Sequence, residues 1–279
     1  MEKIIAAFDG LQYSNSTKEY AVYLAKQTKT HLVGVFMDDF TYTSYKIYEL
    51  VTRQGVSEEK LKQYREKDKA ARDTAADDFE TACQHAGIEY TVHHDRNIAI
   101  QDLKHESIYA DLLIIDAKET LAHYPEKQPT RFIRDLLSDA QCPVLLVPQK
   151  FKPVEKIILL FDGEPSSVHA IKMFSYLLPQ LTQIEADVIS VNPVNTTLNM
   201  PDNKLMKEFM KRHYPKAKYK VMKGLAEDEI VKYLKQQSGN ALVVLGAYRR
   251  GAISRLFRES MADILMQKTK LPLFIAHNK

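Results

Sequence analysis

The sequence predicts an α/β fold built from two tandem, doubly wound units, each a five-stranded parallel sheet flanked by helices. Apolar runs of strand length alternate with helix-like segments along the chain, and the order of these segments is repeated once. Parallel neighbouring strands need a crossover between them, usually a helix, so the alternation favours parallel sheets. The 279 residues are enough for one large domain or two ordinary ones.

Each copy of the repeat opens with a short apolar run that ends in Asp-Gly. Residues 3–10 read KIIAAFDG, and residues 156–163 read KIILLFDG. Small polar residues and a helical apolar pattern follow in both copies, and Ser16 to Glu19 forms an expected capping box in the first. Second strands are predicted at residues 31–37 and 186–191.

The closing parts of the two copies match as well. Residues 111–116 (DLLIID) correspond to residues 241–246 (ALVVLG), and residues 142–147 (CPVLLV) correspond to residues 271–276 (LPLFIA). Four paired segments in one order indicate an internal duplication, which bears on every motif in the chain.

The remaining elements set the expected domain boundaries. Weaker strands are predicted at residues 89–93 and 218–222, and helices around residues 98–109 and 227–237. The first copy carries an extra charged helix at about residues 58–85, whereas the equivalent segment of the second copy, residues 201–213, is short. We therefore predict one domain at residues 1–148 and another at 154–279, joined by a proline-containing linker at 148–154.

Composition argues against several classes of protein. The net charge of +3, from 39 basic and 36 acidic residues, is too balanced to suggest a nucleic-acid partner, so any anion site has to be local. No apolar run approaches the roughly 20 residues that span a bilayer, so no membrane partner is expected. Cys83 and Cys142 lack metal-ligand spacing and are expected to be buried reduced thiols, which suits a cytoplasmic location.

Residues 241–266 form the most informative stretch of the chain. An apolar strand ends at Gly246, a basic loop follows, and Ser260 to Asp263 has the form of a capping box at the start of a helix. A strand, a loop and a helix N-terminus in this order suit phosphate binding, because backbone N–H groups and the helix dipole point at the anion. The loop carries four arginines: Arg249, Arg250, Arg255 and Arg258. A solvent-exposed loop face would explain these charges equally well.

The duplicated pattern resembles the tandem universal stress proteins of the UspA family, whose fold is similar to that of adenine nucleotide alpha hydrolases. In family members that bind nucleotides, Gly-x-x-Gly, about nine residues and Gly-Ser/Thr wrap the ATP phosphates, and an acid after the first strand contacts the nucleoside. On this sequence the resemblance places Asp162 as the acid and Gly246 as the first glycine. Arg249 stands at the second glycine position, and Glu259 and Ser260 stand at the Gly-Ser pair.

These departures from the family pattern give arguments both for and against nucleotide binding. A side chain at a glycine position hinders close backbone approach, although Arg249 could donate a charge-assisted hydrogen bond to phosphate. Glu259 would repel phosphate unless it points away, and Gly251 partly restores loop flexibility. The candidate cofactor-binding residues are therefore Asp162, Gly246, Arg249, Gly251 and Ser260, with ATP or AMP and magnesium as the ligand.

The first copy departs further, because the segment after Asp116 has two prolines and no glycine before its last helix. Asp9 remains, but an acid at the end of a strand can equally cap a helix. The first copy is thus interpreted as a degenerate, structural unit.

The resemblance implies a stress-response protein that acts by binding rather than by catalysis. A nucleotide-free interaction module with an unknown protein partner is favoured, an adenine-nucleotide sensor with one site in the second copy is the alternative, and slow ATP hydrolysis is a third hypothesis. No catalytic or metal-binding motif is present, so neither catalytic nor metal residues are assigned. The resemblance also implies an internal pseudo-dimer in which residues 142–147 and 271–276 lie near each other, and further oligomers stay open.

Overall fold

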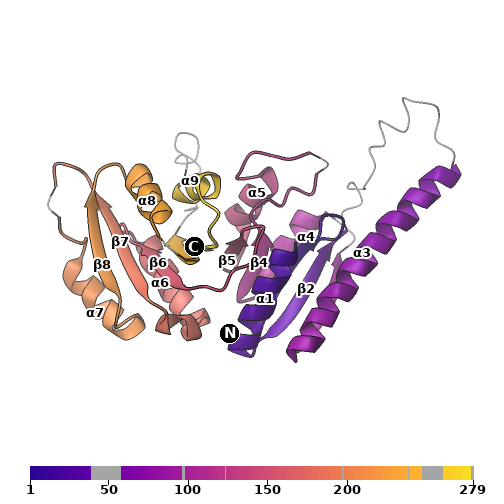
Figure 1. The fold of residues 1–279 in the computed structure, drawn as a ribbon, viewed down its shortest axis with the longest axis horizontal. Helices are drawn as coiled ribbons and strands as arrows, with labels where there is room; N and C mark the ends of the chain where they lie inside the picture. Colours follow the sequence, from indigo (N-terminus) through magenta and orange to yellow (C-terminus); the bar gives the residue numbers. More distant parts are fainter. Residues whose placement is uncertain are drawn as a thin grey trace.

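The computed structural model describes residues 1–38, 58–95, 98–122, 124–196, 198–237, 239–246 and 260–277. These residues form a ten-stranded sheet with helices on both faces (Figure 1). We call β1 to β5 with their helices the first half and β6 to β10 with their helices the second half.

The elements follow the predicted order in both halves. The first half contains β1 (Lys3–Asp9), α1 (Asn15–Thr28), β2 (His31–Met37), α3 (Glu58–Ala86), β3 (Tyr90–Asp95), α4 (Ala99–Glu106), the short 3-10 helix η1 (Ser107–Tyr109), β4 (Leu112–Asp116), α5 (Arg131–Asp139) and β5 (Val144–Val147). The second half contains β6 (Lys156–Leu160), α6 (Pro165–Leu177), the 3-10 helix η2 (Pro179–Gln183), β7 (Ala186–Asn192), α7 (Asn203–His213), β8 (Lys218–Lys223), α8 (Ala226–Lys235), β9 (Ala241–Gly246), α9 (Met261–Lys268) and β10 (Leu273–Ala276).

The strand order along the sheet is β3-β2-β1-β4-β5-β10-β9-β6-β7-β8. Paired strands within each half are parallel, as the alternation of strands and helices predicted. The last strands of the two halves, β5 and β10, pair antiparallel, with Leu145 opposite Phe274. The two predicted sheets are therefore joined edge to edge, and the implied contact between the last strands is confirmed.

The start of α1 differs from the predicted capping box. The helix begins at Asn15, and the hydroxyl of Ser14 accepts a hydrogen bond from the N–H of Thr17 at 3.2 Å. Ser16, the expected cap, is instead buried in the first turn. A cap must precede the helix to reach its free N–H groups, and Ser14 is the residue in that position.

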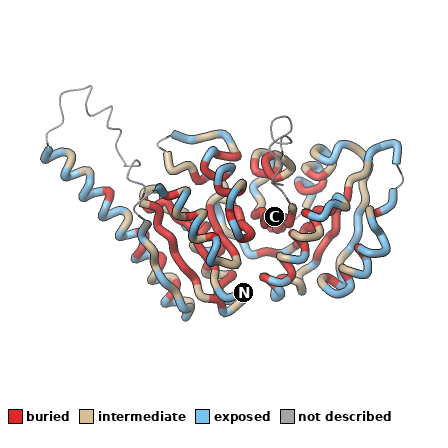
Figure 2. Tube along the Cα trace, turned by 180° about the vertical axis from the view of Figure 1, so that it is seen from behind, coloured by how far each residue is buried: buried red, intermediate tan, exposed pale blue. Residues whose placement is uncertain are grey.

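Helices cover the two faces of the sheet in a regular way. The apolar residues of α1, α3, α6 and α7 pack on one face, and those of α4, α5, α8 and α9 pack on the other. Apart from the edge strands β3 and β8, whose described side chains are exposed or half-exposed, the strands between them are almost continuously buried, as the red stretches in Figure 2 show. Such strands need no alternation of polar and apolar residues, because both faces lie in the core.

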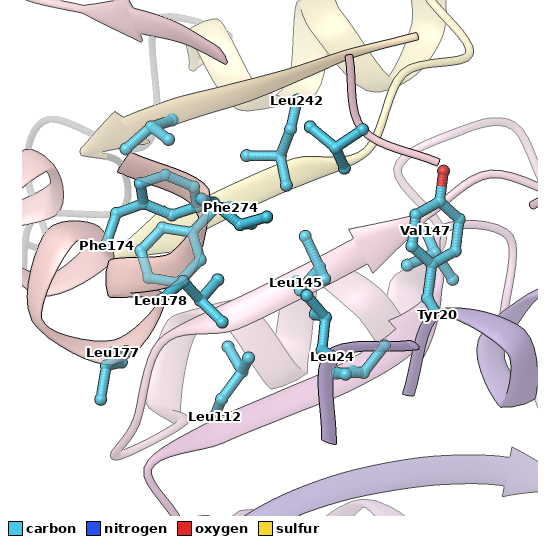
Figure 3. Close-up of a cluster of buried hydrophobic side chains, with 14 of the residues drawn as sticks. Tyr20, Leu24, Leu112, Leu145, Val147, Phe174, Leu177, Leu178, Leu242 and Phe274 are labelled. Carbon is cyan, nitrogen blue, oxygen red and sulfur yellow. The ribbon is translucent and has the colours of Figure 1, made fainter. Parts of the chain in front are cut away.

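The apolar core continues from one half into the other. On the face covered by α1 and α6, one cluster contains residues of both halves, as Figure 3 shows around β5 and β10. The labelled members are Tyr20, Leu24, Leu112, Leu145 and Val147 of the first half and Phe174, Leu177, Leu178, Leu242 and Phe274 of the second. The halves therefore share a core as well as a sheet.

Polar and aromatic contacts fix the segment that connects the halves. The side-chain amide of Asn240 donates to the carbonyl oxygen of Lys152 at 2.8 Å and to the hydroxyl of Tyr20 at 3.2 Å. The ring of Phe151 packs against the ring of Tyr20, with 4.7 Å between centroids. The connection is thus held by both halves at once.

Both cysteines are buried and form no disulfide bond, as predicted. Burial raises the pKa of the Cys83 thiol to about 12, so the reactive thiolate is scarce at neutral pH. Among the described helices, none is both long and apolar enough to cross a bilayer.

Candidate functional site

The strand order places a crevice at the carboxyl ends of the strands in each half. From β1 the chain moves outward to β2 and β3 and then returns to the other side of β1 as β4, so the order reverses between β1 and β4. The same reversal lies between β6 and β9. Ligands of open α/β sheets bind at such reversals. Among the described candidate residues, Asp162 follows β6 and Gly246 ends β9, the two strands on either side of the second reversal.

Asp162 lies in the exposed turn between β6 and α6. Its Oδ1 atom accepts hydrogen bonds from the N–H of Glu164 at 2.9 Å and from the hydroxyl of Ser167 at 2.7 Å. Both donors lie at the start of α6, so the carboxylate joins the turn after β6 to this helix. A carboxylate has about four acceptor sites, so a hydroxyl of a ligand could bind as well.

Gly246 ends β9 directly against the first turn of α6. A Cβ atom at this position would lie 2.3 Å from the carbonyl oxygen of Ser166 and 2.4 Å from its carbonyl carbon. Backbone atoms cannot move aside as a flexible side chain can, so only glycine fits without a shift of the strand or helix. The close packing of β9 and α6 therefore explains this glycine without reference to a ligand.

Ser260 caps α9, as the sequence predicted. Its hydroxyl accepts a hydrogen bond from the N–H of Asp263 at 3.2 Å. Asp162 and Gly246 both contact the first turn of α6, whereas the described bond of Ser260 is within its own helix. The two other candidates, Arg249 and Gly251, lie outside the described residues, as does Glu259.

In the first half, the position that corresponds to Gly246 holds Asp116. Its Oδ2 atom accepts a hydrogen bond at 2.9 Å from the hydroxyl of Ser14, the residue that caps α1. Its Oδ1 atom accepts from the N–H of Lys118 at 2.8 Å. A negative charge of the protein itself thus lies at the helix N-terminus that would otherwise favour a phosphate.

A second carboxyl group of this crevice, that of Glu119, is almost completely buried. Its Oε1 atom accepts hydrogen bonds from the N–H groups of Thr120 and Leu121, each at 2.9 Å. Burial, together with the negative charges of Asp9 and Asp116, raises the pKa of Glu119 to about 8. The group is therefore mostly neutral at pH 7, beside two other carboxyl groups.

Sequence reasoning did not assign Asp116, Glu119 or Ser14 to this crevice. Ser14 and Asp116 are 102 residues apart in the sequence, so no local pattern connects them. The repeat does contain a usable signal, because its alignment places Asp116 opposite Gly246. An acid at the position of a phosphate-loop glycine indicates that the first crevice has changed its chemistry.

The described residues contain no group of three or more His, Cys, Asp or Glu side chains that could hold a metal ion. His93, which lies on β3, pairs with Glu106 at 2.8 Å between Nδ1 and Oε1. This contact ties β3 to α4 and leaves the histidine in a structural role.

No protein-family model matches the sequence, and no curated protein does either. Solved structures match over its whole length. The chain is similar to a universal stress protein from Archaeoglobus fulgidus DSM 4304, with a TM-score of 0.70, 14% identity, and 99% of this chain and 98% of that chain covered. A functionally unknown protein from Pseudomonas aeruginosa PAO1 gives a TM-score of 0.63 and 14% identity, with 99% and 92% covered. A protein from Pseudomonas aeruginosa UCBPP-PA14 assigned to the universal stress proteins gives a TM-score of 0.60 and 15% identity, with 99% of this chain and 93% of that chain covered. At these identities the comparisons concern the fold, and the chain has the fold of the tandem universal stress proteins from β1 to β10.

Proposed function

We propose that this protein acts by binding rather than by catalysis, as a nucleotide-free interaction module in stress regulation. The observation that carries the proposal is the set of carboxyl groups in the first crevice. Asp116 occupies the glycine position and is bonded to the cap of α1, and Glu119 is buried beside it. A phosphate there would meet negative charge and would displace internal hydrogen bonds.

The second crevice supports the same proposal. The carboxylate of Asp162 bonds the start of α6, Gly246 is required for packing, and the hydroxyl of Ser260 caps α9. Each described candidate thus has a structural role that needs no nucleotide. The serine hydroxyls that contact these carboxylates, those of Ser14 and Ser167, also bond the first turns of α1 and α6. We therefore assign them structural roles, and the proposal includes no reaction.

A one-site adenine-nucleotide sensor is the second candidate, because Asp162 is exposed at the point where the strand order reverses. Its carboxylate retains acceptor capacity for a ribose hydroxyl, and α9 begins with a capped N-terminus that suits an anion. In this alternative ATP or AMP, with or without magnesium, would bind only to the second half.

Calorimetric titration separates the two candidates. ATP and AMP would be titrated, with and without magnesium, into protein that has been unfolded and refolded to remove carried-over ligand. The nucleotide-free module predicts no binding heat up to about millimolar ligand. A dissociation constant of about 1 mM corresponds to a binding free energy of about −4 kcal/mol. Binding of one equivalent that Asp162→Ala abolishes and Asp9→Ala preserves would instead establish the sensor.

A further inference from the structure

A groove of about 690 Å³ lies between the two halves, and none of the candidate residues Asp162, Gly246 and Ser260 lines it. Its walls come from the chain after β4 and β5, from the ends of α8 and α9, and from the chain that enters β10. Grooves of this size at the junction of two units commonly bind ligands. Neither the sequence repeat nor the fold assigns a ligand to this groove.

The groove is lined by six exposed lysines: Lys118, Lys150, Lys152, Lys235, Lys268 and Lys270. One acid, Asp116, also lines it, and its two oxygens already accept bonds from Ser14 and from the N–H of Lys118. Within the described part of the chain, none of the six lysines forms an ion pair. Six positive charges gathered around one negative charge repel one another, and an acidic ligand would relieve that repulsion.

The floor of the groove is apolar. Leu234, Met266 and Leu273 line it from the second half and are almost fully buried, and Leu271 lines it while partly exposed. Lysine side chains can lie along such a surface and keep their ammonium groups in water. The groove thus offers apolar contact below and positive charge around it.

The surrounding helices argue against a compact phosphate ligand. Both α8 and α9 end at the groove, in Lys235 and Lys268, and the C-terminus of a helix carries a partial negative charge. Concentrated phosphate charge would meet two such ends. Carboxylates spread along an extended chain can instead reach separate lysines, each at a distance from the helix ends.

We propose that this lysine groove binds an extended acidic segment of a partner protein, with apolar residues between its Asp or Glu residues. The proposal builds on the interaction module proposed above, for which it names a surface and the chemistry of the partner. Electrostatic attraction would speed the encounter, and burial of the apolar side chains would hold the complex together.

A short fluorescein-labelled peptide of Glu residues interleaved with Leu is the probe, and fluorescence anisotropy is the readout. Lys150, Lys152 and Lys270 would be changed together to Gln, because these three lie outside the helices. Surface ion pairs contribute modestly, so the three losses together are expected to weaken binding by about tenfold. The matched control changes three exposed lysines on or near α7 and alters the net charge equally: Lys204→Gln, Lys207→Gln and Lys216→Gln.

The proposal requires that the dissociation constant of the control variant for the peptide stays within about twofold of that of the unaltered protein. General electrostatic attraction alone would weaken the binding of both variants alike. Equal weakening, or no binding of the peptide, would overturn it. Inorganic tripolyphosphate forms the second arm. If it bound with groove-lysine dependence and displaced the peptide at lower concentration, the groove would be a phosphate site and the polypeptide proposal would be wrong. Nucleotide binding that depends on Asp162 would contradict the proposed function but would not contradict the proposal that this groove binds an acidic segment.

Discussion

Glu119 illustrates how a single side chain in the first crevice responds to pH. The residue is 8% exposed, and burial followed by the charge of Asp9 raises the pKa of its carboxyl group to about 8 from an ordinary value of 4.5. The folded protein therefore holds this proton at pH values where the unfolded chain has lost it. Stability is then unaffected by this group below about pH 4.5, decreases as the pH rises, and reaches its lower level above about pH 8.

Glu119→Gln is expected to remove this loss of folding stability at high pH. The amide oxygen can still accept from the N–H groups of Thr120 and Leu121, but it does not ionise. Since one pKa unit corresponds to about 1.4 kcal/mol, the rise of the pKa from 4.5 to about 8 should make the variant more stable than the unaltered protein at pH 8 by on the order of 4 kcal/mol. Urea unfolding at pH 5 and pH 8 measures the difference. The exposed Glu208→Gln serves as the control, and an equal gain in both variants would contradict the assignment to Glu119.

The carboxyl groups also show what the sequence could and could not reveal at the residue scale. Ser260 as a cap follows from a local pattern of four residues, and the structure confirms it. The bond between Ser14 and Asp116 depends on the relative placement of β1 and β4, which local patterns do not contain. The buried position of Glu119 was likewise beyond prediction, because the charged and proline-containing segment around it reads as an exposed loop.

At the scale of elements, the strands and most helices were predictable because both faces of the sheet are buried. Apolar runs such as residues 241–246 then have little alternative to a parallel strand, and the repeat supports each assignment twice. Predicted boundaries were less accurate where proline intervenes. The strands β5 and β10 begin at Val144 and Leu273, each directly after a proline, because proline lacks the N–H that a strand ladder uses.

The contact between β9 and α6 gives a prediction at this scale. Gly246→Ala should destabilise the protein by about 1–3 kcal/mol, because the added methyl group meets the backbone carbonyl of Ser166. Gly10→Ala provides the comparison, since the nearest atom there is the Cγ of Arg72, at 2.7 Å in a flexible side chain, and a smaller loss is expected. Thermal unfolding without any nucleotide measures both. An unaltered midpoint for Gly246→Ala would refute the packing role of this glycine.

At the scale of the whole molecule, the pairing of β5 with β10 and the shared apolar cluster should make the two halves unfold together. The sequence contains no Trp, so a single reporter can be placed at either end of the sheet. Tyr90→Trp would report from β3 and Tyr219→Trp from β8, the two edge strands. Both reporters are expected to give the same urea midpoint.

Leu145→Ala then tests the coupling through the joint. Leu145 is fully buried on β5 beside β10, so its truncation should cost about 2–5 kcal/mol. The loss should lower the midpoint equally at Tyr90→Trp and Tyr219→Trp, although both reporters are distant from the substitution along the sheet. A shift confined to the first-half reporter would mean that the halves unfold separately.

A partner-binding role without a nucleotide in either crevice can be tested on the ligand content of the protein as cells make it. Freshly purified protein would be denatured, and the released nucleotides would be measured by chromatography against the protein concentration. For the nucleotide-free module, well below one equivalent of ATP or AMP is expected. A stoichiometric amount that Asp162→Ala eliminates would contradict it and would establish the second half as a nucleotide site.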